Sequence, residues 1–132
     1  MARLPELVAA YLESEGVATR ATNLWADQWL ADPDVAVGVI GNPGSFDYTF
    51  GGPPKAVNQR LQILTRAGPG DSDAAMTLAE DILGLLYDLT NVTIGDATVL
   101  SMTAAHQPVP YEVDDRHRTS MTTNYDIVAR NA

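Results

Sequence analysis

The residues best able to do chemistry lie in one short run, Asp114-Asp115-Arg116-His117-Arg118. Paired carboxylates beside a histidine are groups that bind a divalent cation or exchange protons with a substrate. Adjacent residues of an extended segment point in different directions, however, and the two arginines would repel a cation. We therefore interpret the run as a solvated turn or a salt-bridged interface loop. A small acidic enzyme or ligand-binding domain that uses Asp114, Asp115 and His117 is the alternative from a different functional class.

No other part of the sequence predicts a catalytic, cofactor-binding or metal site. His106 ends a predicted strand with no nearby nucleophile, so we interpret it as structural. The chain has no cysteine, which excludes disulfides, thiolate nucleophiles and zinc–thiolate sites. It contains no nucleophile elbow, P-loop or zinc-protease motif, and the glycines at 38, 41 and 44 do not have dinucleotide-binding spacing. We therefore expect a protein that is not an enzyme.

The charge of the chain also limits its partners. Eight Lys and Arg against seventeen Asp and Glu give the 132 residues a net charge of −9, of which residues 1–66 carry −2 and residues 67–132 carry −7. Nonspecific DNA binding relies on basic side chains that neutralise phosphates, so we do not expect this acidic protein to bind nucleic acid or an anionic membrane. No apolar run approaches 18 residues, and glutamates interrupt any signal-peptide core, so we expect a protein that stays in the cytoplasm after synthesis.

Two main helices follow from the spacing of apolar residues. The first is predicted over 5–15, where Gly16 stops it. The second is predicted over 73–89, after an N-cap at Asp71 or Ser72, and its apolar residues recur at i, i+3, i+4 and i+7. Its apolar arc is about 200° wide, more than packing on a sheet requires. We expect the extra flank to contact the first helix or another subunit through Met76, Leu83 and Tyr87.

Short alternating segments predict the strands of one sheet. They lie at 35–41, 57–66, 97–106 and 119–129, with a possible fifth at 46–50. Residues 22–31 fit either a short helix or an irregular segment, and we expect their tryptophans, Trp25 and Trp29, to lie in the core. The sequence thus predicts a single α+β domain over 1–132, with a mostly antiparallel four- to five-stranded sheet and two main helices packed on one face.

The Gly- and Pro-rich stretch 41–54 contains three alternating aromatic residues, and no predicted helix is placed to cover it. The tripeptide at 42–44 predicts a turn. We expect a flexible loop or hairpin arm that contacts a neighbouring subunit through Phe46, Tyr48 and Phe50, and an ordinary edge strand is the alternative.

The order of elements from Leu4 to Arg130 carries a family resemblance. A helix (LPELVAAYLESEG) leads to a short strand (VAVGVIG), an aromatic loop (NPGSFDYTFGGPP) and a strand with Gln and Arg (VNQRLQILTR). An Ala-rich helix follows (DAAMTLAEDILGLLYDL), then a strand that precedes a proline (MTAAHQPVPYEVDDRHRTS) and a closing strand (TTNYDIVAR). This layout resembles the tail terminator and related minor capsid, tail-completion or neck proteins of long-tailed bacteriophages.

The resemblance implies a mechanical function without catalysis or cofactors. Tail terminators form a six-fold ring on the tail tube, stop its growth and present the surface on which the head docks. The implied partners are further copies of the chain, the tail tube protein and a head–tail connector or head-completion protein. DNA would pass through the lumen without specific binding, repelled in part by acidic side chains lining it, and no membrane is involved. Another neck-completion protein is the close alternative.

The resemblance also places the protein in the virion and suggests how its subunits meet. The expected location is the tail or neck, after assembly in the cytoplasm of the bacterial host. The aromatic arm and the apolar helix flank are the expected parts of a head-to-tail ring contact. Arginine binds a carboxylate with two parallel hydrogen bonds, so we expect three arginines to pair with an acidic neighbouring subunit: Arg60, Arg116 and Arg118.

Overall fold

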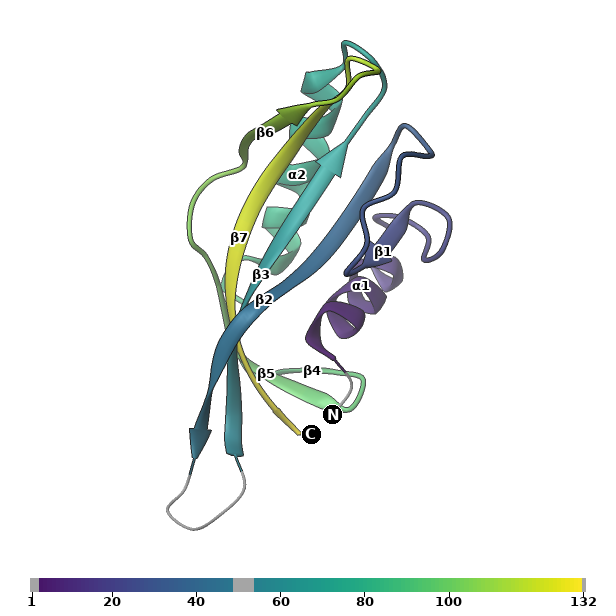
Figure 1. Ribbon diagram of the computed structural model, residues 1–132. Coiled ribbons are helices and arrows are strands. Elements are labelled where there is room, and N and C mark those ends of the chain that lie inside the picture. Colours follow the sequence, from purple (N-terminus) through teal and green to yellow (C-terminus); the bar gives the residue numbers. More distant parts are fainter. Residues whose placement is uncertain (1–2, 49–53, 132) are drawn as a thin grey trace.

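The computed structural model describes residues 3–48 and 54–131, and for 43–48 and 54–55 it describes the backbone (Figure 1). Two helices and seven strands follow one another along this part of the chain. They are α1 (Leu4–Ser14), β1 (Leu24–Ala26), β2 (Ala36–Tyr48), β3 (Pro54–Arg66), α2 (Ser72–Leu86), β4 (Val92–Ile94), β5 (Ala97–Ala104), β6 (Val109–Val113) and β7 (Thr119–Asn131).

All seven strands belong to one sheet, in the order β1-β2-β3-β7-β5-β4, with β6 paired to β7 off this path. Strands β1 and β2 are parallel, and every other described pair is antiparallel. The predicted α+β class is therefore confirmed, but the predicted four- to five-stranded antiparallel sheet is wrong in size and in type. The additional strands are three to five residues long, too short to show a clear alternation in the sequence.

The core lies between one face of the sheet and the two helices, as predicted. Alternate residues of each long strand point to this face, so register matches such as Leu61 with Tyr125 and Val39 with Ile63 place buried side chains next to each other. Helix α1 packs on β1 and β2, and α2 packs on β3 and β7. The fully buried side chains of the helices include Val8, Leu12, Ile82 and Leu86.

Local capping explains where the helices begin and end. Helix α1 has Pro5 in its first turn, where a missing N–H costs nothing. It ends at Ser14, two residues before Gly16, whose φ of +79° favours glycine. At α2, the side chain of Asp71 accepts a hydrogen bond from the Ala74 N–H, as the sequence predicts. Helix α2 ends at Leu86, three residues earlier than predicted, because Tyr87 has an extended backbone with ψ of 127° and Asp88 has a positive φ of 65°.

The stretch around 42–48 differs from the sequence prediction. No turn forms at 42–44, since β2 continues through it and pairs with β3 from Asn42 opposite Arg60 to Ser45 opposite Asn58, across a β-bulge. The bulge accommodates Pro43, which cannot donate a ladder hydrogen bond. Because β7 pairs with β3 only from Val57 onward, the end of the β2–β3 hairpin projects beyond the sheet as a two-stranded arm (Figure 1).

The segment 29–34 covers the sheet face that points away from the helices, at the end of the sheet far from the arm. Trp29 lies directly over Gly38, where an added Cβ would stand 2.7 Å from the indole ring, so the strand needs glycine at this position. Trp25 is buried and Trp29 half-buried. Residues 22–31 therefore contain the short strand β1 followed by an irregular segment, and the helical interpretation is wrong.

We expect Ile82→Asp to lower the free energy of unfolding by about 3–5 kcal/mol, because it buries an unpaired carboxylate between α2 and the sheet. The melting temperature should fall by about 10 °C or more. Thr77→Asp adds the same charge to an exposed position of α2 and serves as the control. If both variants melt like the parent in a calorimetric scan, the assignment of this helix face to the core is wrong.

Candidate interaction surfaces

The run 114–118 forms the turn between β6 and β7, and its polar groups bond to one another. The Asp114 carboxylate accepts hydrogen bonds from the backbone N–H groups of Arg116 and Arg118, each at 3.0 Å. The Arg118 Nε donates to the other carboxylate oxygen at 2.8 Å. The run is thus a turn whose charges pair within the chain, and both Asp114 oxygens accept hydrogen bonds there, while a role at an interface stays a prediction.

Arg118 is 2% exposed, which is unusual for a charged side chain, and it is fully hydrogen-bonded. One Nη donates to the Ala31 carbonyl at 2.7 Å and lies 3.0 Å from the Asp34 carboxylate, while the other lies 2.7 Å from the Asp114 carboxylate. Removing either carboxylate would leave a buried cation partly unpaired, which is costly in a low-dielectric interior.

Two further arginines hold the same segment. Arg66, 3% exposed, stacks over the Trp29 ring at 4.6 Å and donates to the carbonyls of Pro33 and Asp34 at 2.6 and 3.1 Å. Arg116 pairs with Asp32 at 2.7 Å. We call Arg66, Arg116 and Arg118 the arginine clamp, because together they fix residues 29–34 to the end of the sheet.

The clamp holds its carboxylates in the ionised form. Hydrogen bonds from the Arg118 and Arg116 backbone and from the Arg118 side chain lower the pKa of Asp114 to about 2, and pairing with Arg116 lowers the pKa of Asp32. The hydrogen bond to Asp114 raises the pKa of Arg118. None of these three groups titrates near neutral pH, so none is suited to general acid–base catalysis there.

The histidines and the acidic residues do not assemble into a metal site. His106 uses both ring nitrogens: Nδ1 lies 2.6 Å from the Gln107 carbonyl, and Nε2 accepts from the Asn124 N–H at 3.3 Å. Among the side chains that the structure describes, those of residues 3–42 and 56–131, no three of His, Cys, Asp or Glu are grouped as metal ligands would be. His106 therefore has the structural role predicted for it.

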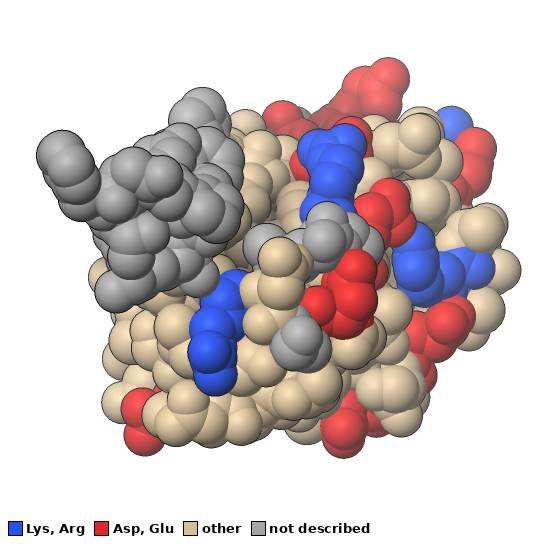
Figure 2. Space-filling model, turned by 90° about the horizontal axis from the view of Figure 1, so that it is seen from below, with Lys and Arg blue, Asp and Glu red and all other residues tan. Residues whose placement is uncertain are grey.

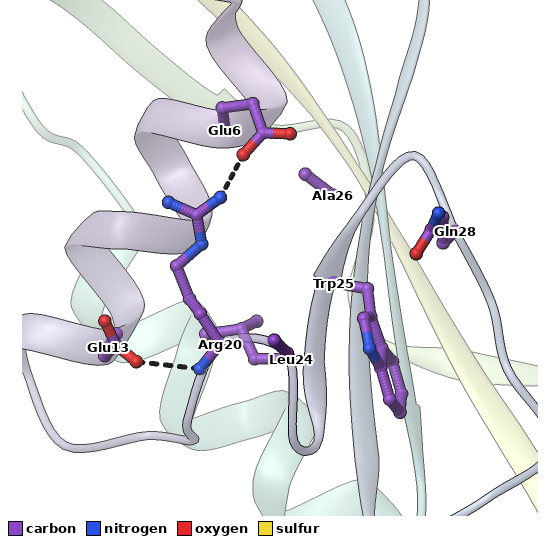
Figure 3. A pocket seen from close by; sticks show the side chains of 8 residues that line it. Glu6, Glu13, Arg20, Leu24, Trp25, Ala26 and Gln28 are labelled. Atoms are coloured by element: carbon purple, nitrogen blue, oxygen red, sulfur yellow. Dashed lines mark hydrogen bonds and ion pairs between the residues drawn. The ribbon is translucent and has the colours of Figure 1, made fainter.

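An open pocket of about 570 Å³ lies between α1 and β1, and Leu24 and Trp25 are among the residues that line it (Figure 3). The Arg20 side chain forms an ion pair with Glu6, and the Arg20 backbone N–H donates to Glu13 at 2.7 Å. The labelled charged groups thus pair with one another across the pocket.

The structure gives the three predicted interface arginines partners inside the chain. Arg60 pairs with Asp126 across β3 and β7 at 3.2 Å, and Arg116 and Arg118 belong to the clamp. Their pairing with a neighbouring subunit stays a prediction. On the α2 flank, Met76 and Leu83 are half-buried and Tyr87 is 63% exposed.

The backbone of the arm places Phe46 opposite Val57 and Tyr48 opposite Pro54. Their side chains, and Phe50 altogether, lie outside the described residues. Figure 2 views the end of the molecule from which the arm projects, where acidic and basic side chains are interspersed without a continuous basic area among the described residues. The described residues at this end therefore form no continuous basic surface suited to the phosphates of DNA.

Strand β6 is an exposed edge that the sequence analysis missed. All five of its residues are exposed, and among them are three large apolar side chains: Val109 at 43%, Tyr111 at 54% and Val113 at 65%. One edge of β6 pairs with β7, and no described strand pairs with the other. The alternation of these three residues was a usable signal, but Pro108 and Pro110 hid it.

We expect Asp114→Asn to lower the melting temperature at pH 7 by loosening the clamp. The folded-state pKa of about 2 lies below the ordinary value of about 3.9, so the ionised carboxylate stabilises the fold above about pH 4, and this contribution is lost as the pH falls toward 2. The difference between parent and variant should therefore shrink over that range. Asp115→Asn removes an exposed neighbouring carboxylate and should have little effect. An equal difference at pH 7 and pH 2 would contradict the assignment.

The comparison with known families bears out the resemblance seen in the order of elements. The chain matches the family model described as bacteriophage tail terminator protein over residues 11–131, which is nearly its whole length. No curated protein matches it significantly. Neither α1 nor α2, the helices of the described chain, has the length and apolarity that a membrane crossing requires. The chain belongs to the bacteriophage tail terminator family, whose members are structural proteins of the phage.

Proposed function

We propose that this protein caps the tail tube of a long-tailed bacteriophage. In this proposal, copies of the chain close into a ring, a hexamer, that stops tube polymerisation and provides the surface for head–tail joining. The observation that carries the proposal is the family match over residues 11–131. Its partners are then other copies of itself, the tail tube protein and the head–tail connector or head-completion protein, within the tail or neck of a virion assembled in the host cytoplasm.

The geometry supports a head-to-tail contact between copies. The arm leaves the sheet beyond Val57, while β6 borders β7 at the other end, near Arg66. Nine residues of strand separate these ends, about 30 Å. A contact between two different surfaces of one molecule generates a ring or a filament, whereas a symmetric contact stops at a dimer. We therefore assign the arm of one copy to the β6 edge of the next.

The same proposal gives the acidity a role. Residues 67–115 contain nine Asp and Glu and no Lys or Arg, and this stretch includes all of α2. A ring that turns part of this surface toward its lumen would repel passing DNA instead of binding it. A structure of the assembled ring with a neutral or basic lumen would remove this part of the proposal.

The proposed function is tested by adding the purified protein to a polymerisation reaction of the tail tube protein from the same phage. Electron microscopy should show tubes that stop growing and carry an additional ring at one end. Tubes that elongate without a cap at saturating protein would contradict the proposal, whatever the oligomeric state of the free protein.

Substituting Phe46, Tyr48 and Phe50 by Ser should yield a folded protein that fails to cap tubes, because the arm would lose its apolar contacts with the neighbouring copy. Circular dichroism verifies folding, and the tube assay measures capping. If heads still join tails of normal length, the arm is not an interface.

A double variant of β6, Tyr111→Asp with Val113→Asp, should also abolish ring formation, because it adds two charges to the proposed receiving edge. The matched control is Thr93→Asp, an exposed position on the short strand β4. Both variants should melt near the parent temperature. Normal rings from the double variant would exclude β6 as the contact.

A further inference from the structure

A groove of about 470 Å³ lies between the end of α1 and α2. Its apolar lining comes from Val17, which follows α1, and from Leu78 and Leu85 of α2, all half-buried against the main core. The turn at Gly16 fixes Val17, whose N–H donates to the Leu12 carbonyl at 3.0 Å. The groove is therefore preformed by capped backbone and does not need a ligand to shape it.

The rim of this α1–α2 groove carries charge of one sign. Glu15, Glu80 and Asp81 line it, all exposed, and none forms an ion pair with a described residue. No Lys or Arg contributes to the lining. An apolar floor with an uncompensated acidic rim is complementary to aliphatic side chains flanked by cationic ones.

Gly84 supplies an independent observation. It lies inside α2, where glycine destabilises a helix relative to alanine, and it lines the groove. A Cβ added at Gly84 would meet no atom within 4 Å, so nothing inside the described chain requires a residue without a side chain there. A glycine on a helix surface allows another backbone to approach closely. The space over Gly84 is therefore open to a backbone from outside the subunit.

From these three observations we infer that the α1–α2 groove docks a segment of a different protein, in which Lys or Arg side chains flank aliphatic ones and whose backbone passes over Gly84. The aliphatic side chains lie on Val17, Leu78 and Leu85, and the cations pair with the rim. The groove is separate from the arm and from β6, so this inference stands whether or not the ring forms as proposed.

A second copy of the chain does not fit as the occupant. Six of the eight basic residues are already engaged within the chain, in ion pairs or, for Arg66, on carbonyls and a tryptophan: Arg3, Arg20, Arg60, Arg66, Arg116 and Arg118. The other two, Lys55 and Arg130, are 75 positions apart in the sequence. A copy therefore offers no single continuous segment that carries two cations outside these contacts.

The test uses a synthetic 16-residue helical peptide with leucines on one face and lysines beside them, and a reference peptide with glutamates in place of the lysines. Each peptide is titrated into the full chain, and the amide resonances of the chain are followed by NMR. We expect the lysine peptide to shift the amide resonances of Val17, Leu78, Gly84 and Leu85, and the glutamate peptide to shift none of these. Shifts spread evenly over all acidic surfaces would overturn the inference.

Variants separate docking from folding. Gly84→Ala should raise the melting temperature by improving the helix, yet weaken peptide binding at least tenfold by placing a methyl group under the peptide backbone. Glu80→Gln with Asp81→Asn should weaken binding about tenfold, whereas Asp73→Asn, on the same helix outside the groove, should not. Unchanged affinity in Gly84→Ala overturns the inference. So does self-association of the parent that Gly84→Ala abolishes, since that result would assign the groove to a second copy.

Discussion

Hydrogen bonding along both edges of β7 is the constraint on which the rest of this structure depends. One edge pairs with β3 from Val57 to Arg66, and the other is shared by β5 and then β6. The alternating residues of β7 bury Tyr125, Ile127 and Ala129 under the helices. Because β7 separates from β3 after Ala129 and continues beside β5, the β2–β3 hairpin projects beyond the sheet. Because β5 stops pairing with β7 before β6 starts to pair with it, β6 becomes a separate edge. Both proposed ring surfaces thus follow from the register of one strand.

The arginine clamp completes the other end of the sheet by electrostatics rather than by apolar packing. Arg66 and Arg118 are both almost fully buried, and their charges disfavour each other, as the lowered pKa of Arg66 reflects in addition to its burial. Two buried cations side by side need nearby acceptors for their donors. The carbonyls of Ala31, Pro33 and Asp34, with the carboxylates beside them, supply the acceptors. The position of segment 29–34 is therefore set by the need to satisfy two buried cations.

The sequence predicted the helices and strands correctly where one face of an element is buried and the other is exposed to solvent. The period of α2, the alternation of β3 and β7, and the cap at Asp71 each arise from local physics, and the structure confirms them. The sequence did not predict the elements whose formation depends on pairing with a strand that is distant in the sequence. Three residues of β1 form a strand only because β2 lies beside them, and Pro43 is tolerated in a strand only because a bulge forms there. The partners of Arg118 are up to 87 positions away, so no local pattern could identify them.

The same intrachain pairing changes the meaning of the net charge of −9. A surface with interspersed free cations would neutralise itself locally, but here the arginines are held in the clamp, in the pair between β3 and β7, and beside α1. The stretch 71–96, which contains α2, has six Asp and Glu and no Lys or Arg, and the acidic residues of the groove rim have no ion-pair partner in the described structure. The excess of negative charge is therefore concentrated on the α2 side of the molecule. Such a surface repels a polyanion and attracts a cationic protein segment, and both consequences suit a subunit that must join other proteins around DNA without adhering to it.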